Sequence, residues 1–199
     1  MNEINILGIV GSLRKASYNH AALKAAQALL PAGAVLNLIE LHGLPVFNQD
    51  EEMTPPAAVL EFKRRILTAD AILFATPEYN YSVPGALKNA IDWASRPYGN
   101  SAWTGKPAAL MGASPGNLGT ARAQYHLRQI LVGFGMPVVS QPEVMISQAA
   151  QHFDPDGKLI DAPTRERIQK LLNALVQLVK ADAASRRMAA AGNGITGTP

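Results

Sequence analysis

Cysteine is absent from this sequence of 199 residues, and charged residues make up only 17% of it. Without cysteine the chain forms no disulfide, no thiolate metal site and no thiol redox centre, so redox activity would depend on a bound group. No run reaches the ~18–20 uncharged apolar residues of a membrane-spanning helix, and no cationic leader precedes the first apolar run. We therefore expect a cytoplasmic protein without a metal site or a membrane partner.

The charge balance is mildly basic, with a formal net charge of +3 and a sequence pI near 9.3. Such a surface favours anionic ligands. However, the dense stripe of Lys and Arg that nucleic-acid binding requires is missing. The densest cluster, Lys63-Arg64-Arg65, falls within a predicted helix, where it is interpreted as a solvated face. We expect no nucleic-acid partner.

What the chain does contain is an alternation of apolar runs of strand length with helical patterns. Hydrophobic periodicity predicts five strands, at residues 4–10, 35–41, 71–75, 107–113 and within 138–146. The last helix is predicted to begin near Thr164. This βαβα order predicts an α/β fold in which a parallel sheet carries helices on both faces. We expect one domain over residues 1–185 and, from its small, aperiodic composition, a flexible tail over residues 186–199.

The stretch "GSLRKASYN", residues 11–19, leaves the first predicted strand and leads into a helix. Gly11 allows a tight turn, and short polar and cationic side chains follow it. Together with the free N–H groups of the helix N-terminus, they predict a phosphate site. An alternative stays open, in which Ser17 or Asn19 only caps the helix. Neither G-x-x-x-x-G-K-[ST] nor G-x-G-x-x-G follows this strand, so a P-loop NTPase and an ordinary dinucleotide fold are not supported.

A second stretch, "TPEYNYSVPGALKNAIDWASRP" at residues 76–97, leaves the third predicted strand. Parallel sheets bind ligands beyond the carboxyl ends of their strands, so both stretches belong to one ligand-binding edge. Tyr79 and Tyr81 are interpreted either as a wall beside an aromatic ring or as ordinary surface packing. Ser82 stands where it would cap the helix that begins at residues 83–84.

These two stretches, in this order and spacing, resemble the signatures of the NADPH-dependent FMN reductase family, and most closely its bacterial soluble quinone and chromate reductases. The resemblance covers about residues 4–180 and includes "SRPYGNSAWTGKP" and "RAQYHLRQILV". It implies a flavodoxin-like fold, strand order 2-1-3-4-5, with noncovalent FMN. The FMN-binding residues it implies are Ser12, Leu13, Arg14, Ser17 and Asn19 at the phosphate, Pro77, Glu78, Tyr79, Asn80 and Ser82 at the ring, and Ser114 and Gly116 at the ring's other edge.

The resemblance also implies the activity. NADPH or NADH would pass a hydride to flavin N5, and a quinone would then accept the electrons in a ping-pong cycle, without a catalytic side chain. Chromate is a further candidate acceptor, on charge matching to Arg14 and Lys15 alone. Two alternatives stay open: a flavin reductase that releases reduced FMN, and a flavodoxin-type electron carrier, which the positive net charge disfavours.

Assembly is the last expectation from the resemblance. It implies a homodimer that completes the flavin site, and a homotetramer joined through Arg122, Tyr125 and Glu143. Arg122 and Tyr125 lie three residues apart and share one side of a helix. Aromatic residues of the second stretch and of the long loop after it suit an interface, or pack within their own domain: Trp93, Tyr98 and Trp103.

Overall fold

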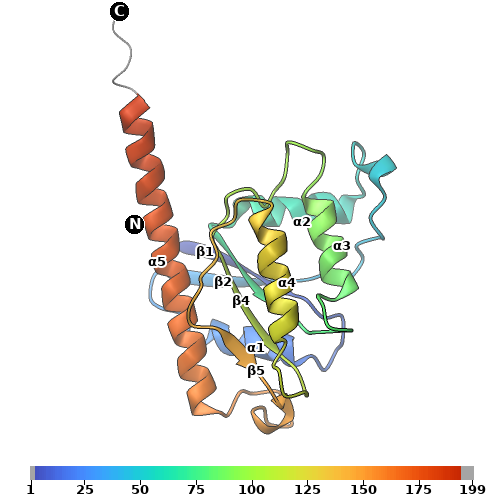
Figure 1. The fold of residues 1–199 in the computed structure, drawn as a ribbon, viewed down its shortest axis with the longest axis vertical. Coiled ribbons are helices and arrows are strands. Elements are labelled where there is room, and N and C mark those ends of the chain that lie inside the picture. The colour runs from blue at the N-terminus through green and yellow to red at the C-terminus, as the bar shows by residue number, and fades with distance from the viewer. Residues whose placement is uncertain (1–2, 194–199) are drawn as a thin grey trace, which may run out of the picture.

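The structure is a computed structural model that describes residues 3–193, except for the side chains of residues 190–193. Its centre is a five-stranded parallel sheet in the order β2-β1-β3-β4-β5 (Figure 1). The flavodoxin-like strand order predicted from the resemblance is confirmed. The strands are β1 (Ile4–Val10), β2 (Ala34–Glu40), β3 (Ala71–Ala75), β4 (Ala108–Ala113) and β5 (Val144–Ile146).

Five α-helices cover the sheet in two layers. The strands bury apolar side chains against α1 and α5 on one face, and against α2, α3 and α4 on the other, which confirms the prediction of helices on both faces. The helices are α1 (Tyr18–Gln27), α2 (Ala57–Thr68), α3 (Gly85–Ala94), α4 (Ala121–Val132) and α5 (Ala162–Asn193), with short 3₁₀ turns η1 (Gln49–Glu51) and η2 (Ala149–Gln151).

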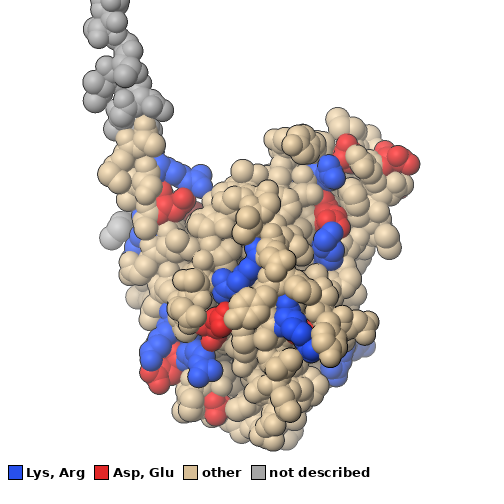
Figure 2. Space-filling view, viewed as in Figure 1, with Lys and Arg blue, Asp and Glu red and all other residues tan. Residues whose placement is uncertain are grey.

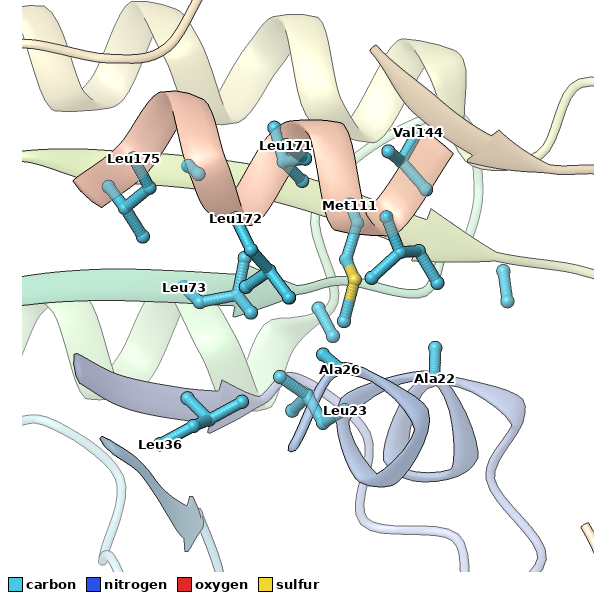
Figure 3. Packing of buried hydrophobic residues seen from close by; sticks show 14 of the residues in the cluster. Ala22, Leu23, Ala26, Leu36, Leu73, Met111, Val144, Leu171, Leu172 and Leu175 are labelled. Atoms are coloured by element: carbon cyan, nitrogen blue, oxygen red, sulfur yellow. The ribbon is translucent and has the colours of Figure 1, made fainter. Parts of the chain in front are cut away.

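The apolar runs become central strands because both of their faces are buried. In β1, Ile6 belongs to the core layer under α1 and α5, whereas Leu7 belongs to the layer under α2, α3 and α4. This alternation follows from the two-residue period of a strand. Figure 3 shows the first layer, where Leu23 of α1 and Leu172 of α5 pack with Leu73 and Met111 of the sheet. A strand buried in this way requires apolar residues on both faces.

The C-terminal helix differs from the prediction. It begins at Ala162 and continues to Asn193, so residues 186–193 are helical rather than a flexible tail (Figure 1). Alanine has the highest helix propensity, and alanine-rich sequence extends the helix without a repeating apolar pattern. Arg186 also anchors this part, since its Nη2 donates to the Gly105 carbonyl at 2.9 Å. Residues 194–199 of the predicted tail lie outside the described residues.

Both tryptophans lie in the core, so for them the alternative of packing within their own domain is the correct one and the interface role is wrong. Trp93 is 1% exposed and Trp103 is fully buried, whereas Tyr98 is 91% exposed. The indole N–H of Trp103 donates to the Ile91 carbonyl at 3.0 Å, and that of Trp93 to the Pro45 carbonyl at 2.8 Å. A satisfied indole N–H lets these side chains become buried without a polar penalty.

The surface charges are mixed in sign. Figure 2 shows Lys and Arg interspersed with Asp and Glu on one face. The cluster Lys63-Arg64-Arg65 on α2 is only partly solvated. Arg64 forms an exposed pair with Glu61, as predicted, but Lys63 donates to the carbonyls of Arg96 and Asn100. Burial lowers the pKa of Lys63 below its ordinary value. Over residues 3–193, no helix combines the length and apolarity needed to cross a membrane.

Candidate functional site

The candidate site lies at the carboxyl edge of the sheet, where the loops after β1, β3 and β4 begin side by side. The strand register pairs Val10 with Ala75, and Ala75 with Met111. Hydrogen bonds continue past the strand ends: the Gly11 amide donates to the Ala75 carbonyl at 2.9 Å, and the Thr76 amide to the Met111 carbonyl at 3.0 Å. The two sequence stretches therefore meet at one edge, as the sequence predicted.

Gly11 is required by the closeness of this approach. A Cβ atom at this position would lie 2.9 Å from the Ala75 carbonyl oxygen and 3.2 Å from Pro77 Cδ. Real Cβ atoms do not come within 2.9 Å of a non-bonded heavy atom, and the atom in the way here is a backbone oxygen rather than the end of a flexible side chain. Only glycine lets the chain leave β1 directly beside the exit of β3.

The first loop is organised by two buried serines. The Ser12 hydroxyl accepts from the Arg14 amide, and the Ser17 hydroxyl accepts from the His20 amide, each at 3.3 Å. Ser17 is thus the N-cap of α1, which was the role that the alternative interpretation of this stretch gave it. The cap does not exclude a phosphate role, because it leaves the amides between the two serines unused by it.

The exposed part of this loop fits a phosphate group. The backbone amides of Leu13, Lys15 and Ala16 donate to no acceptor among the described residues. They stand beside the cationic side chains of Arg14 and Lys15 and just before the N-terminus of α1. Unpaired amides, positive charge and a helix dipole together match the phosphate of FMN.

Asn19 has a different role from the one the resemblance implied. Its side chain is 3% exposed and makes two bonds to Ala113 at the end of β4: Nδ2 donates to the carbonyl, and Oδ1 accepts from the amide, each at 2.9 Å. Both polar groups are therefore engaged inside the protein. We correct its predicted role from phosphate ligand to a residue that positions α1 and the first loop against β4.

The second loop contains a strained two-residue turn at residues 79–82. Tyr79 and Ser82 exchange backbone hydrogen bonds of 3.2 and 3.0 Å. Between them, Asn80 and Tyr81 have φ angles of 48° and 68°, in the left-handed region. Asn tolerates this region, whereas a bulky Tyr is rare there. Such strain persists only where surrounding contacts maintain it, and it is characteristic of ligand-binding sites.

Helix α4 supplies the contacts that maintain the turn. The carboxylate of Glu78, whose side chain is 7% exposed, accepts from Arg122 Nε at 2.6 Å and from the Ala123 amide at 3.1 Å. The Arg122 guanidinium also lies 3.6 Å from the centre of the Tyr81 ring. The bond to Glu78 raises the pKa of Arg122 above its ordinary value. One arginine therefore binds the residue before the turn and a residue within it.

A second contact comes from the next turn of the same helix. His126 Nδ1 lies 2.9 Å from the Ser82 hydroxyl. His126 follows Arg122 by four residues and so shares its helix face. That spacing is the signal from which its contact with the second stretch could have been inferred. The Ser82 hydroxyl thus contacts α4 and does not cap α3 as predicted, since the N-cap of α3 is Pro84.

The third loop lies farther toward the β5 edge. The Ser114 amide donates to the Ile146 carbonyl at 3.0 Å, and its hydroxyl donates to the Gly116 carbonyl at 3.4 Å. Gln148 donates its amide to the same carbonyl of Gly116 at 3.0 Å. Ser114 and Gly116 therefore follow β4 as predicted, and their recorded bonds are within the loop or to the β5 side rather than to the first two loops.

The predicted assembly residues are divided between two contacts within one chain. Tyr125 Oη donates to Glu143 Oε2 at 3.2 Å, a bond that raises the pKa of the tyrosine. Arg122 pairs instead with Glu78. Within residues 3–193, no cluster of three His, Asp or Glu side chains could hold a metal ion.

A hollow of about 300 Å³ lies between the first and second loops, and we call it the central hollow. It brings together Ser12, Leu13 and Arg14 of the first loop with Tyr79 of the second. Pro77, Glu78, Asn80 and Ser82 are not part of its lining. Its wall consists of Gly11, Ser12, Leu13, Arg14, Tyr79, Pro84, Gly85 and Ala86.

Known proteins share this sequence and this fold. Residues 4–151 match the NADPH-dependent FMN reductase family. The chain is 54% identical over 175 residues to an NAD(P)H-dependent FMN reductase of Pseudomonas aeruginosa, covering 87% of this chain and 94% of that protein. It is 47% identical over 173 residues to a quinone reductase of Pseudomonas putida, covering 86% and 92%.

A solved structure gives the same answer for the fold. The flavoenzyme NAD(P)H:(acceptor) oxidoreductase FerB of Paracoccus denitrificans superposes with a TM-score of 0.83 at 41% identity, covering 90% of this chain and 98% of that one. The fold and the sequence match agree. The chain therefore belongs to the NADPH-dependent FMN reductase family and is an FMN-dependent NAD(P)H oxidoreductase.

Proposed function

We propose that the chain is a quinone reductase. The observation that carries this proposal is the 47% identity, over most of both chains, to a relative named for that activity. In the overall reaction, NAD(P)H gives up a hydride, and the quinone takes two electrons and two protons, one of them from solvent. The products are NAD(P)⁺ and hydroquinone.

The chain's own residues bind and orient the reactants. Bound FMN supplies the two-electron chemistry between nicotinamide and acceptor. The free amides of residues 13, 15 and 16, together with Arg14, hold the phosphate, and Tyr79 borders the ring. The contacts of Arg122 and His126 hold the turn at residues 79–82 and so keep Tyr79 in place. No side chain is required as a nucleophile. Nicotinamide and quinone occupy the same place in turn, in a ping-pong cycle.

Anaerobic titration tests this function. NADPH or NADH should bleach the visible flavin absorbance of the FMN-loaded protein, and 1,4-benzoquinone should restore it without a partner reductase. Double-reciprocal plots at several quinone concentrations should be parallel, whereas intersecting lines would contradict the ping-pong order. Reduction by neither nicotinamide, or no reoxidation by quinone, would overturn the proposal.

A second candidate is a flavin reductase that releases reduced FMN. It is favoured by the 54% identity to a relative named as an FMN reductase. Anaerobic ultrafiltration after reduction separates the two candidates. Retention of the flavin with the protein supports the quinone reductase, whereas its passage into the filtrate supports the flavin reductase.

Chromate as an additional acceptor is supported only by the exposed cations of the first loop, Arg14 and Lys15. Lys15→Ala should then lower chromate reduction more than quinone reduction. Equal effects on both acceptors would argue against charge matching. The cytoplasmic location stays a prediction from the sequence.

We further propose that copies of the chain assemble into dimers and then tetramers. The support is an exposed polar pair, Tyr125 with Glu143, together with the aromatic side chains of Tyr98 and Tyr125, which are 91% and 48% exposed. Aromatic residues are enriched in interfaces.

A further inference from the structure

A second hollow, of about 560 Å³, adjoins the central hollow, and of the FMN-binding residues proposed above only Leu13 lines it. We call it the apolar hollow. The two share Leu13, Gly85 and Ala86, so one opens beside the other at the carboxyl edge of the sheet. The lining of the apolar hollow is Leu13, Leu41, Leu44, Val46, Phe47, Gly85, Ala86, Lys88, Asn89 and Asp92.

The outer wall of the apolar hollow is held rigidly against α3. Asn89 bonds to the segment after β2 with both of its polar atoms: Oδ1 accepts from the Phe47 amide at 2.7 Å, and Nδ2 donates to the Pro45 carbonyl at 2.8 Å. Trp93 donates to the same carbonyl, and the Phe47 ring packs edge-on against Trp93 at 5.0 Å between centroids. The hollow is therefore preformed, which reduces the ordering that a ligand would have to induce.

The charges around the apolar hollow cancel. Its only charged lining residues are Lys88 and Asp92, which pair with each other at 2.8 Å. The remaining lining is mainly aliphatic or aromatic, and it includes Val46, which is 86% exposed. An anion would lose hydration here and gain no unpaired cation, whereas a neutral apolar group would cover exposed hydrocarbon.

We propose that the apolar hollow is the subsite for the apolar body of a neutral quinone, whose redox ring faces the FMN site of the central hollow. This inference rests on the proposed function and adds a preference: quinones with a fused or alkyl-substituted ring are better acceptors than 1,4-benzoquinone. The volume of about 560 Å³ is in the usual range for pockets that bind small organic molecules. Val46 is the residue that sets this preference at the rim.

Val46→Asp tests the subsite in the FMN-loaded protein. A charge at the rim should raise the KM for 2-methyl-1,4-naphthoquinone about tenfold, because the bound quinone would displace water from the carboxylate. The KM for NADPH and the kcat/KM for 1,4-benzoquinone should stay within about twofold. The matched control is Val132→Asp, which changes a valine of 74% exposure that does not line the hollow.

Equilibrium dialysis gives a readout that does not depend on turnover. Oxidised protein without NADPH should bind 2-methyl-1,4-naphthoquinone about tenfold more weakly after Val46→Asp, and unchanged after Val132→Asp. Equal effects on both quinones, or no effect, would overturn the subsite. So would sedimentation showing that only Val46→Asp breaks up an assembly, because a second copy would then cover the hollow. If the wild type reduces neither quinone, it is the proposed function that fails.

Discussion

At the scale of single residues, Asn19 connects two elements that lie 94 residues apart in sequence. Asn19→Ala would leave the amide and carbonyl of Ala113 without their partner in a buried place. We predict a loss of about 2–4 kcal/mol in the free energy of unfolding, measured by chemical denaturation. Asn37→Ala is the control, because Asn37 makes one exposed bond. Equal losses in the two variants would contradict the positioning role.

Arg14 carries the opposite expectation, a large effect on ligand and a small one on fold. Its side chain is exposed at the first loop and makes no hydrogen bond or ion pair within residues 3–193. Arg14→Ala should weaken FMN binding at least about tenfold through loss of a charge-assisted contact worth about 1.5–3 kcal/mol. FMN titration into flavin-free protein measures this, with the exposed Lys24→Ala as control. Unchanged affinity would show that the phosphate is bound elsewhere.

At the scale of elements, α4 holds the strained turn at residues 79–82 in place. Arg122→Ala removes the partner of Glu78 and the cation over the Tyr81 ring. We predict faster hydrogen exchange at the amides of Tyr79 and Ser82, because local opening becomes easier when the contacts that maintain strain are lost. Arg64→Ala, which breaks an exposed pair on α2, should leave these amides unchanged. Exchange that is equally slow in both variants would show that Arg122 does not hold the turn in place.

The start of α5 provides a pH-dependent prediction. Hydrogen bonds from the hydroxyl and amide of Thr164 lower the pKa of Asp161 below its ordinary value of 3.8. A lowered pKa in the folded state means that stabilisation is complete above the unfolded value and is lost as pH falls through the folded one. Near neutral pH, Asp161→Ala should reduce the free energy of unfolding by about 1 kcal/mol, as for other N-caps.

Denaturation of the wild type and the variants across this range tests the prediction. The difference between wild type and Asp161→Ala should shrink as the pH falls below 3.8. Asp161→Asn keeps an oxygen acceptor for Thr164, so it should retain most of the cap without this titration. A difference independent of pH would mean that the ionised carboxylate contributes nothing to the cap.

At the scale of the whole molecule, the prediction concerns how copies of the chain assemble. Arg122 is bound to Glu78 in its own chain, so Glu143 is the cleaner probe of contacts between copies. We predict a tetramer at micromolar concentration that Glu143→Gln shifts toward dimers, because the charge available to a cation of another copy is removed. Sedimentation measures this. A monomeric wild type would refute both levels of assembly, and a stable wild-type dimer only the second.

Much of the fold followed from local pattern in the sequence. Apolar runs of two-residue period and helical spacing were enough to predict five parallel strands covered on both faces, because each pattern reports burial of its own element. The two loop stretches likewise follow strands directly, so the order of the chain placed them at one edge of the sheet. Local composition misled at the C-terminus, where alanine propensity carries α5 through residues 186–193.

What only the tertiary structure decided is which polar and aromatic groups meet across long sequence separations. Asn19 pairs with Ala113, Arg122 with Glu78, and Trp103 with the Ile91 carbonyl inside the core. Sequence alone determined the family, the sheet and the meeting of the two loop stretches at one edge, because these depend on motifs and periodicity within single elements. It did not determine these partners, because a hydrogen bond or a buried contact depends on distances that exist only after the elements have packed together.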